Sequence, residues 1–149
     1  MAVTQFKSVS EMDMGKGMAV TNTARGMSFI LDEPPSLGGT DQGMNPVEGL
    51  LSALGACKCI VAKAFASKNR IKLESVRIEC EGDLDPDGFL GKNPEAKIGF
   101  SRIKTNYFFK ADNTEEELQA FVRFIESHCP VMDSIVNTPV MEDSLTIER

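Results

Sequence analysis

Several residue types that often carry function are scarce in this chain. Among 149 residues there is no tryptophan, one tyrosine, one histidine and four cysteines. Four cysteines are too few for a disulfide scaffold of this length. Positive charge is also scarce, because 16 Lys and Arg stand against 22 Asp and Glu, for a net charge of −6. Nucleic acid is therefore not an expected partner, since domains that bind it normally present a basic surface.

Long hydrophobic runs are missing as well. The first residues contain no apolar segment of the kind that a signal peptide needs, so we expect a cytoplasmic protein whose thiols are kept reduced. The longest apolar run, residues 49–62, is too short to span a bilayer, and we expect no membrane partner. The sequence also has no internal repeat. A length of 149 residues with 42% hydrophobic content predicts a single domain, residues 1–149, with a sizeable core.

The apolar run predicts a buried central helix over residues 45–69. Asn45 is a suitable N-cap, Pro46 suits the first helical position, and Glu48 lies in the first turn, where the helix dipole favours a carboxylate. Only Ser52 and Lys58 interrupt the apolar run between residues 49 and 62. A helix that is apolar nearly all round belongs in the interior of a protein.

The same helix carries a stripe of small residues. Gly49, Ser52, Ala53 and Ala56 follow helical spacing and so share one face. Such a stripe allows another backbone to approach closely.

The remaining segments complete an α+β chain. Strands are expected within residues 2–12 and 17–31, over 71–81 and 96–110, and at the end over 144–148. A glycine-rich loop is expected over 36–44, and a helix over 113–128 with a capping box at Thr114 and Glu117. Pro130 is expected to open a further helical turn. Strands and helices do not alternate regularly, which favours α+β over a βαβ series.

The four cysteines differ in setting. Cys57 and Cys59 are separated by about 200° around a helix, so only one of them can face a given site. Cys80 lies on the apolar face of a predicted strand, as a small core residue would. Cys129 sits at a junction before Pro130, where a resolving thiol is plausible.

Other interpretations of these thiols stay open at this point. Cys57 and Cys59 can equally be core residues. A zinc site built from Cys57, His128 and Cys129 is a further alternative.

Three segments together resemble a known family. The run N-P-V-E-G-L-L-S-A-L-G-A-C at 45–57, the H-C-P-V at 128–131 and the D-E-P-P-S-L-G-G-T-D-Q-G at 32–43 are similar to the OsmC/Ohr family of osmotically induced and organic-hydroperoxide-resistance proteins. The resemblance implies an OsmC-like fold, in which antiparallel sheets wrap around a long buried central helix in an intertwined homodimer.

The resemblance also implies an activity, that of a peroxiredoxin-like thiol peroxidase in oxidative-stress defence. Cys57 matches the peroxidatic cysteine, Cys129 the resolving cysteine, and Glu48 the glutamate at the helix start. In the family that glutamate pairs with an arginine of an early hairpin, whose position falls near Lys16 here, with Arg25 as the nearest arginine. The implied substrate is a small organic hydroperoxide, and an external dithiol is the implied reductant, without a bound cofactor or metal.

The position of Glu48 predicts a dimer independently of the family. Nine residues separate it from Cys57, which is roughly 13.5 Å along a helix and about 180° around it. A site that uses both groups must therefore take Glu48 from a second chain. Two antiparallel helices that cross near Ser52 and Ala53 would meet this condition, and we expect a two-fold dimer with two composite sites.

Two other functions remain compatible with the sequence. The chain can be a non-enzymatic OsmC-like dimer that binds a small apolar ligand, with its cysteines in the core. It can also be a zinc protein or a general thiol–disulfide protein.

Overall fold

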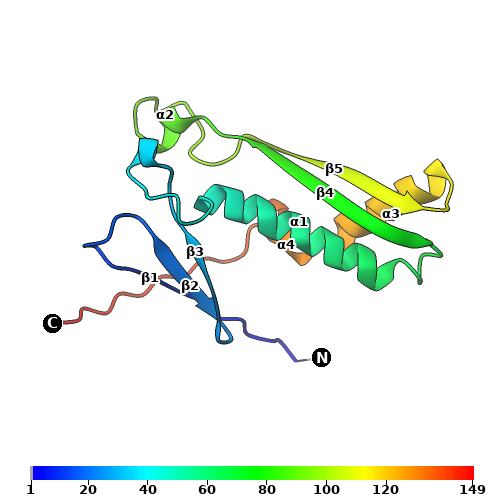
Figure 1. Ribbon diagram of the computed structural model, residues 1–149, viewed down its shortest axis with the longest axis horizontal. Coiled ribbons are helices and arrows are strands. Elements are labelled where there is room, and N and C mark those ends of the chain that lie inside the picture. Colours follow the sequence, from blue (N-terminus) through cyan, green and yellow to red (C-terminus); the bar gives the residue numbers. More distant parts are fainter. Residues whose placement is uncertain (1) are drawn as a thin grey trace. The chain divides into compact units, whose positions relative to one another are not determined.

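The computed structural model describes residues 2–149 as two compact units, with the boundary inside a helix after Ser52. The first unit contains a three-stranded antiparallel sheet in the order β1-β2-β3 (Figure 1). Its strands are β1 (Val9–Met12), β2 (Val20–Ala24) and β3 (Met27–Leu31).

The expected strand regions of this unit are partly corrected. Residues 2–8 are not in a strand, and residues 17–31 form a hairpin instead of one continuous strand. The chain reverses at Arg25 and Gly26, whose φ angles are 51° and 80°. Glycine adopts positive φ without a steric penalty, and this residue supplies the turn between β2 and β3.

A carboxylate organises the glycine-rich segment that follows. The Asp32 side chain, 2% exposed, accepts hydrogen bonds from the backbone N–H groups of Glu33, Thr40 and Gln42. It also accepts one from the Thr40 hydroxyl at 2.6 Å. This segment includes the short 3-10 helix η1 (Pro35–Leu37) and ends at the start of the long helix.

The long helix α1 (Pro46–Phe65) begins as predicted and ends earlier than predicted. Asn45 Oδ1 accepts from the Glu48 N–H, and Glu48 Oε2 accepts from the Asn45 N–H, each at 2.9 Å. This reciprocal pair satisfies two backbone donors at the helix start. Residues 66–70 form turns, and the chain leaves them through Arg70 at φ 59°.

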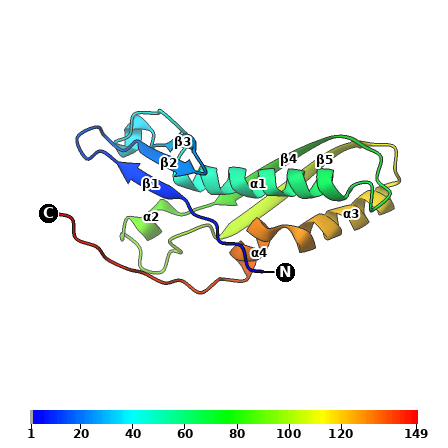
Figure 2. The same cartoon turned by 90° about the horizontal axis from the view of Figure 1, so that it is seen from below.

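The second unit is an antiparallel ribbon with helices packed on one face. Figures 1 and 2 both show the ribbon alongside α1. Its elements are β4 (Leu73–Asp83), β5 (Arg102–Ala111), α2 (Pro86–Phe89), α3 (Glu115–His128) and α4 (Pro130–Val136). The predicted alternation of both strands, the capping box of α3 and the turn opened by Pro130 are confirmed.

The core of this unit lies between the ribbon and the helices. Leu54 and Val61 of α1 and Phe121 and Ile125 of α3 are buried there. The sequence predicts that α1 is buried nearly all round, but within one chain only one side of the helix is buried. Leu54, Lys58, Val61 and Ala62 are buried, whereas Ile60 is 68% exposed.

Further predictions are corrected in this unit. Residues 71–72 and 96–101 lie outside the strands expected there, since β4 and β5 begin later, and residues 144–148 form no strand. The turn cluster after β4 contains α2, which begins because the Asp85 side chain accepts the Asp87 N–H and Pro86 occupies the first turn. Among residues 2–149, no helix has the length and apolar character needed to cross a membrane.

Candidate functional site

Two thiols from distant parts of the sequence lie next to each other in the second unit. Cys57 comes from α1 and is partly buried against the core. Cys129 is 2% exposed and lies at the junction where α3 ends and α4 begins. Cys57 packs against the core cluster that contains Cys129, and the Cys57 side chain raises the pKa of the Cys129 thiol. Both are free thiols.

The surroundings of Cys129 keep it protonated. Burial raises the pKa of its thiol, and the adjacent Cys57 side chain raises the pKa further. A hydrogen bond from the Met132 N–H to Sγ, at 3.4 Å, opposes this shift without reversing it. A thiol of this kind is a poor first nucleophile, because the thiolate is the reactive form.

The other two cysteines lie away from the Cys57 side of α1. Helical rotation turns Cys59 away from Cys57, and Cys80 belongs to β4. Cys80 Sγ is 3.9 Å from the Thr105 hydroxyl of the neighbouring strand. It also lies 3.6 Å from the point that a Cβ on Gly55 would occupy, which places β4 close to the helix there. Burial raises the pKa of Cys59, with a further contribution from Cys80.

The single histidine is held away from the thiols by local contacts. The His128 ring stacks on Phe124, with 3.9 Å between ring centroids. Its Nδ1 lies 2.9 Å from the Phe124 carbonyl oxygen and 2.8 Å from the Ser127 hydroxyl. Within residues 2–149, no three side chains from His, Cys, Asp and Glu are grouped as metal ligands would be.

The predicted charged residues of the first unit are engaged locally. Glu48 is paired with Asn45 in the helix cap. Lys16 forms an exposed ion pair with Asp13 at 3.2 Å. Arg25 occupies the turn between β2 and β3. In the described residues of this unit, no ion pair joins Glu48 to either cation, so their shared role stays a prediction.

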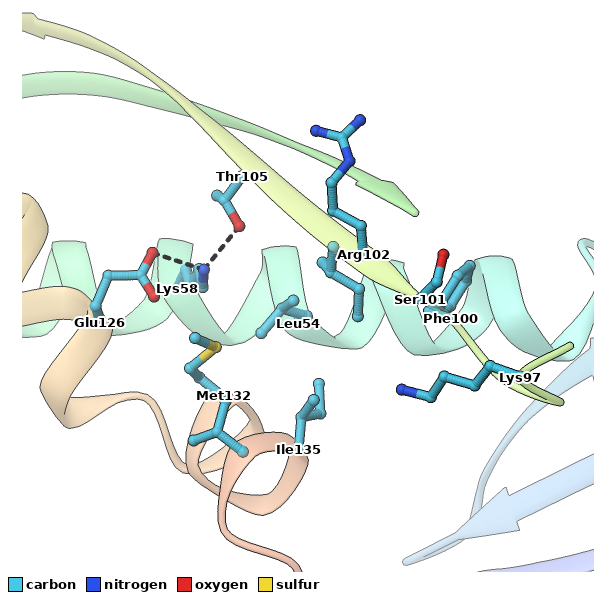
Figure 3. Close-up of a pocket in the computed structure, with 12 residues that line it drawn as sticks. Leu54, Lys58, Lys97, Phe100, Ser101, Arg102, Thr105, Glu126, Met132 and Ile135 are labelled. Carbon is cyan, nitrogen blue, oxygen red and sulfur yellow. Dashed lines mark hydrogen bonds and ion pairs between the residues drawn. The ribbon is translucent and has the colours of Figure 1, made fainter. Parts of the chain in front are cut away.

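The sequence did not predict the contacts of Lys58, the residue directly after Cys57. Its side chain is only 1% exposed, which is unusual for a lysine. Nζ lies 2.8 Å from Glu126 Oε1 and 2.8 Å from the Thr105 hydroxyl (Figure 3). The one feature of the sequence that could have indicated a buried ion pair is the presence of this single lysine inside an apolar helical run. Its partner is 68 residues further along the chain, beyond any local pattern.

A pocket of about 360 Å³ lies beside Lys58 and Glu126, which both line it. Its apolar wall comes from α1 and α4, including Leu54, Met132 and Ile135 (Figure 3). Lys97 extends along its edge, while Arg102 turns away and pairs with Asp83 at 2.7 Å. The volume falls in the range of small-molecule sites, which are mostly apolar with a few polar groups.

Comparisons with known proteins identify the family to which this sequence is similar. The family described as OsmC-like protein matches residues 39–142, which include Cys57 and Cys129. A hydroperoxide reductase of Mycoplasma genitalium is 24% identical over 107 residues, covering 71% of this chain and 72% of that protein.

Solved structures show the same fold. The crystal structure of an OsmC-like protein from Mycoplasma pneumoniae has a TM-score of 0.76 at 20% identity, covering 91% of this chain and 89% of that one. An organic hydroperoxide resistance protein OsmC from Legionella pneumophila has a TM-score of 0.64 at 22% identity, covering 92% and 93%. The predicted OsmC-like α+β architecture with antiparallel sheets is therefore confirmed.

Proposed function

Because the chain belongs to the OsmC-like protein family, we propose that it is a thiol-dependent peroxidase that reduces organic hydroperoxides. Cys57 acts as the peroxidatic thiol and Cys129 as the resolving thiol. One observation carries this proposal: two free cysteines 72 positions apart in the sequence (129 − 57) belong to one packed cluster, with Cys129 in the core and Cys57 packed against it. A cytoplasmic role in oxidative-stress defence fits this activity.

The unequal burial of the two thiols supports this division of roles. Cys57 is partly exposed, so a peroxide can reach it, whereas Cys129 is 2% exposed. The raised pKa of Cys129 keeps it as a thiol until a partner sulfur is oxidised. A peroxidatic thiol needs access to the substrate, and a resolving thiol needs access only to the first sulfur.

The reaction balances with these two sulfurs and one external reductant. The Cys57 thiolate attacks the O–O bond of the hydroperoxide, and with one proton the products are a sulfenic acid and an alcohol. The Cys129 thiol then displaces water from the sulfenic acid and forms a disulfide. An external dithiol restores both thiols by exchange and leaves as a cyclic disulfide.

The surroundings favour an organic substrate over hydrogen peroxide. Leu54 and Val61 flank the Cys57 region of α1 and are buried among apolar groups. A hydrocarbon substituent gains from leaving water in such surroundings, and hydrogen peroxide has none. Second-order rate constants for cumene hydroperoxide and hydrogen peroxide test this point, and a large preference for hydrogen peroxide would contradict it.

We further propose that the complete site is formed by two chains. Helical geometry places Glu48 roughly 13.5 Å along α1 from Cys57 and on the opposite side. Glu48 of a partner subunit, with Lys16 or Arg25 as its cation, can complete the site. A lysine would supply charge without the two-pronged contact of a guanidinium.

A single oxidation experiment tests the activity. Reduced protein receives one equivalent of cumene hydroperoxide, and its disulfides are mapped by mass spectrometry after seconds. We expect a Cys57–Cys129 bond. Replacing Cys57 with serine should abolish turnover, and Cys80→Ser should leave turnover unchanged because that thiol lies on another side of α1. Unchanged thiols in the wild-type protein would refute the peroxidase.

The pocket beside Lys58 favours a second candidate function. A space of about 360 Å³ with an apolar wall suits a small apolar ligand, held without any reaction of the cysteines. The same experiment separates the two functions. Unreacted thiols, together with a small molecule retained through purification and detected by native mass spectrometry, would support ligand binding.

A further inference from the structure

Lys58 and Glu126 form an ion pair between the segments that carry the two thiols, and only its lysine is fully buried. The Lys58 ammonium is 1% exposed, and Glu126 Oε1 accepts one of its N–H groups at 2.8 Å. The Thr105 hydroxyl accepts another at 2.8 Å, and the Tyr107 hydroxyl donates to the same Glu126 oxygen. Figure 3 shows the lysine nitrogen between the Glu126 carboxylate and Thr105. An ammonium held out of water requires such partners.

The ion pair connects the two segments that carry the thiols. Lys58 is the residue after Cys57 on α1. Glu126 is in the last turn of α3, three residues before Cys129, which caps that helix. The place where Glu126 is held therefore determines where the end of α3, and with it Cys129, lies along α1.

Apolar packing alone would define this position less sharply. The contact between α1 and α3 includes Leu54, Val61, Phe121 and Ile125. Apolar burial has little directional preference, so a small slide of α3 along α1 would preserve much of it. The same slide would separate a 2.8 Å pair and leave a buried ammonium without its counter-charge.

We propose that the Lys58–Glu126 pair is a positioning element that keeps Cys129 within reach of Cys57 for disulfide closure. This inference rests on the proposed peroxidase function. Two reactions compete for the Cys57 sulfenic acid. Attack by the Cys129 thiol gives a disulfide and water, whereas a second hydroperoxide gives a sulfinic acid and an alcohol. Correct positioning favours the first reaction.

The main test replaces Lys58 with methionine. K58M keeps an unbranched apolar stem in the core and removes the charge. Glu126, whose side chain is 31% exposed, can then be solvated and retains its Tyr107 contact. The matched control is K63M, which removes an exposed lysine from the same helix. K58R, which restores a cation that can reach Glu126, is the rescue variant.

Two rates are measured after mixing with cumene hydroperoxide. The first is formation of the Cys57 sulfenic acid, trapped with a dimedone probe, and the second is disulfide closure followed by quenching and mass spectrometry. We expect K58M to form sulfenic acid within about twofold of wild type and to close the disulfide about tenfold more slowly, as expected for a misplaced reacting group. Sulfinic acid at Cys57 should increase, K63M should match wild type, and K58R should recover closure.

A normal rate of disulfide closure in K58M would overturn the inference. If K58M melts at a lower temperature but closes its disulfide at the wild-type rate, the pair stabilises the fold without positioning the thiols. A wild-type Cys57 that does not react with hydroperoxide would refute the proposed function instead. In that case diamide, which takes two hydrogens from a pair of thiols to give a disulfide and a hydrazine, tests closure in the same variants. Equal closure rates with diamide would then overturn the positioning role.

Discussion

At the scale of single residues, Asp32 shows how one carboxylate can hold an irregular segment. The backbone N–H groups of Glu33, Thr40 and Gln42 all donate to it. The Thr40 hydroxyl does so as well, and this bond makes the largest contribution to lowering the pKa of Asp32 to about 2. These donors favour the charged form of the acid, so the loop is most stable when Asp32 is ionised.

The loop should therefore show an acid-dependent loss of stability that Asp32→Asn removes. A carboxyl whose folded pKa is depressed contributes stability above its unfolded pKa of about 4, and the contribution falls as pH drops toward 2. We expect D32N to melt at a lower temperature than wild type at pH 7. The difference should shrink below about pH 4. Thermal unfolding followed from pH 7 to 2 checks this, and a difference that does not change with pH would contradict it.

At the scale of elements, the sequence predicted those helices and strands that depend on residues close together in the chain, and it failed where an element depends on a distant partner. The caps at Asn45 and Thr114 were predictable because each partner lies three residues away. The alternation of β4 and β5 was predictable because one face of the ribbon packs on a core. The strand expected over 144–148 had the right residue types, but the structure pairs that segment with no neighbouring strand.

In the candidate site, too, local relations were predictable from the sequence and long-range contacts were not. The Cys57–Cys129 pairing came from a family resemblance, because no spacing rule joins residues so far apart. The Lys58–Glu126 pair was missed for the same physical reason, since α3 packs on α1 only in the folded chain. Helical rotation, a local property, correctly separated Cys57 from Cys59.

The glycine-rich loop before α1 should depend on close backbone approach at one glycine. A Cβ on Gly39 would lie 1.8 Å from the Glu33 carbonyl oxygen, which is a backbone atom that cannot easily move. We expect Gly39→Ala to lower the free energy of unfolding by about 1–3 kcal/mol or more, as steric overlap generally does. The control is Gly99→Ala, because a Cβ there would have no atom within 4 Å. Urea unfolding measures both, and equal effects would contradict the prediction.

At the scale of the whole molecule, α1 leaves one side uncovered in a single chain. Ser52, Ala53 and Ala56 of the small-residue stripe are exposed. Ile60 on the same helix is 68% exposed. Apolar surface of this kind commonly marks an interface. A second copy of the chain, packed with its α1 antiparallel to the first, would cover the stripe.

A charge on this stripe should therefore separate the proposed dimer. We expect wild type to sediment as a dimer at micromolar concentration and Ala56→Arg to sediment as a monomer without peroxidase activity, because the arginine would be buried against the partner helix. Gln119→Arg adds the same charge to an exposed position on α3 and should remain an active dimer. A wild-type monomer with full activity would rule out the composite site.

Mixing two inactive variants tests whether Glu48 and Cys57 act across the interface. C57S lacks the thiol and E48Q lacks the carboxylate, so we expect each homodimer to be inactive. If the site takes Glu48 from the partner subunit, a heterodimer contains one site with both native residues. Random exchange makes half of the dimers hetero, which restores about a quarter of the wild-type sites. If both residues acted within one chain, no subunit of the mixture would hold both, and the peroxidase assay would show no recovery. Activity near a quarter of wild type therefore assigns Glu48 to the partner's thiol, whereas an inactive mixture of verified heterodimers excludes that assignment.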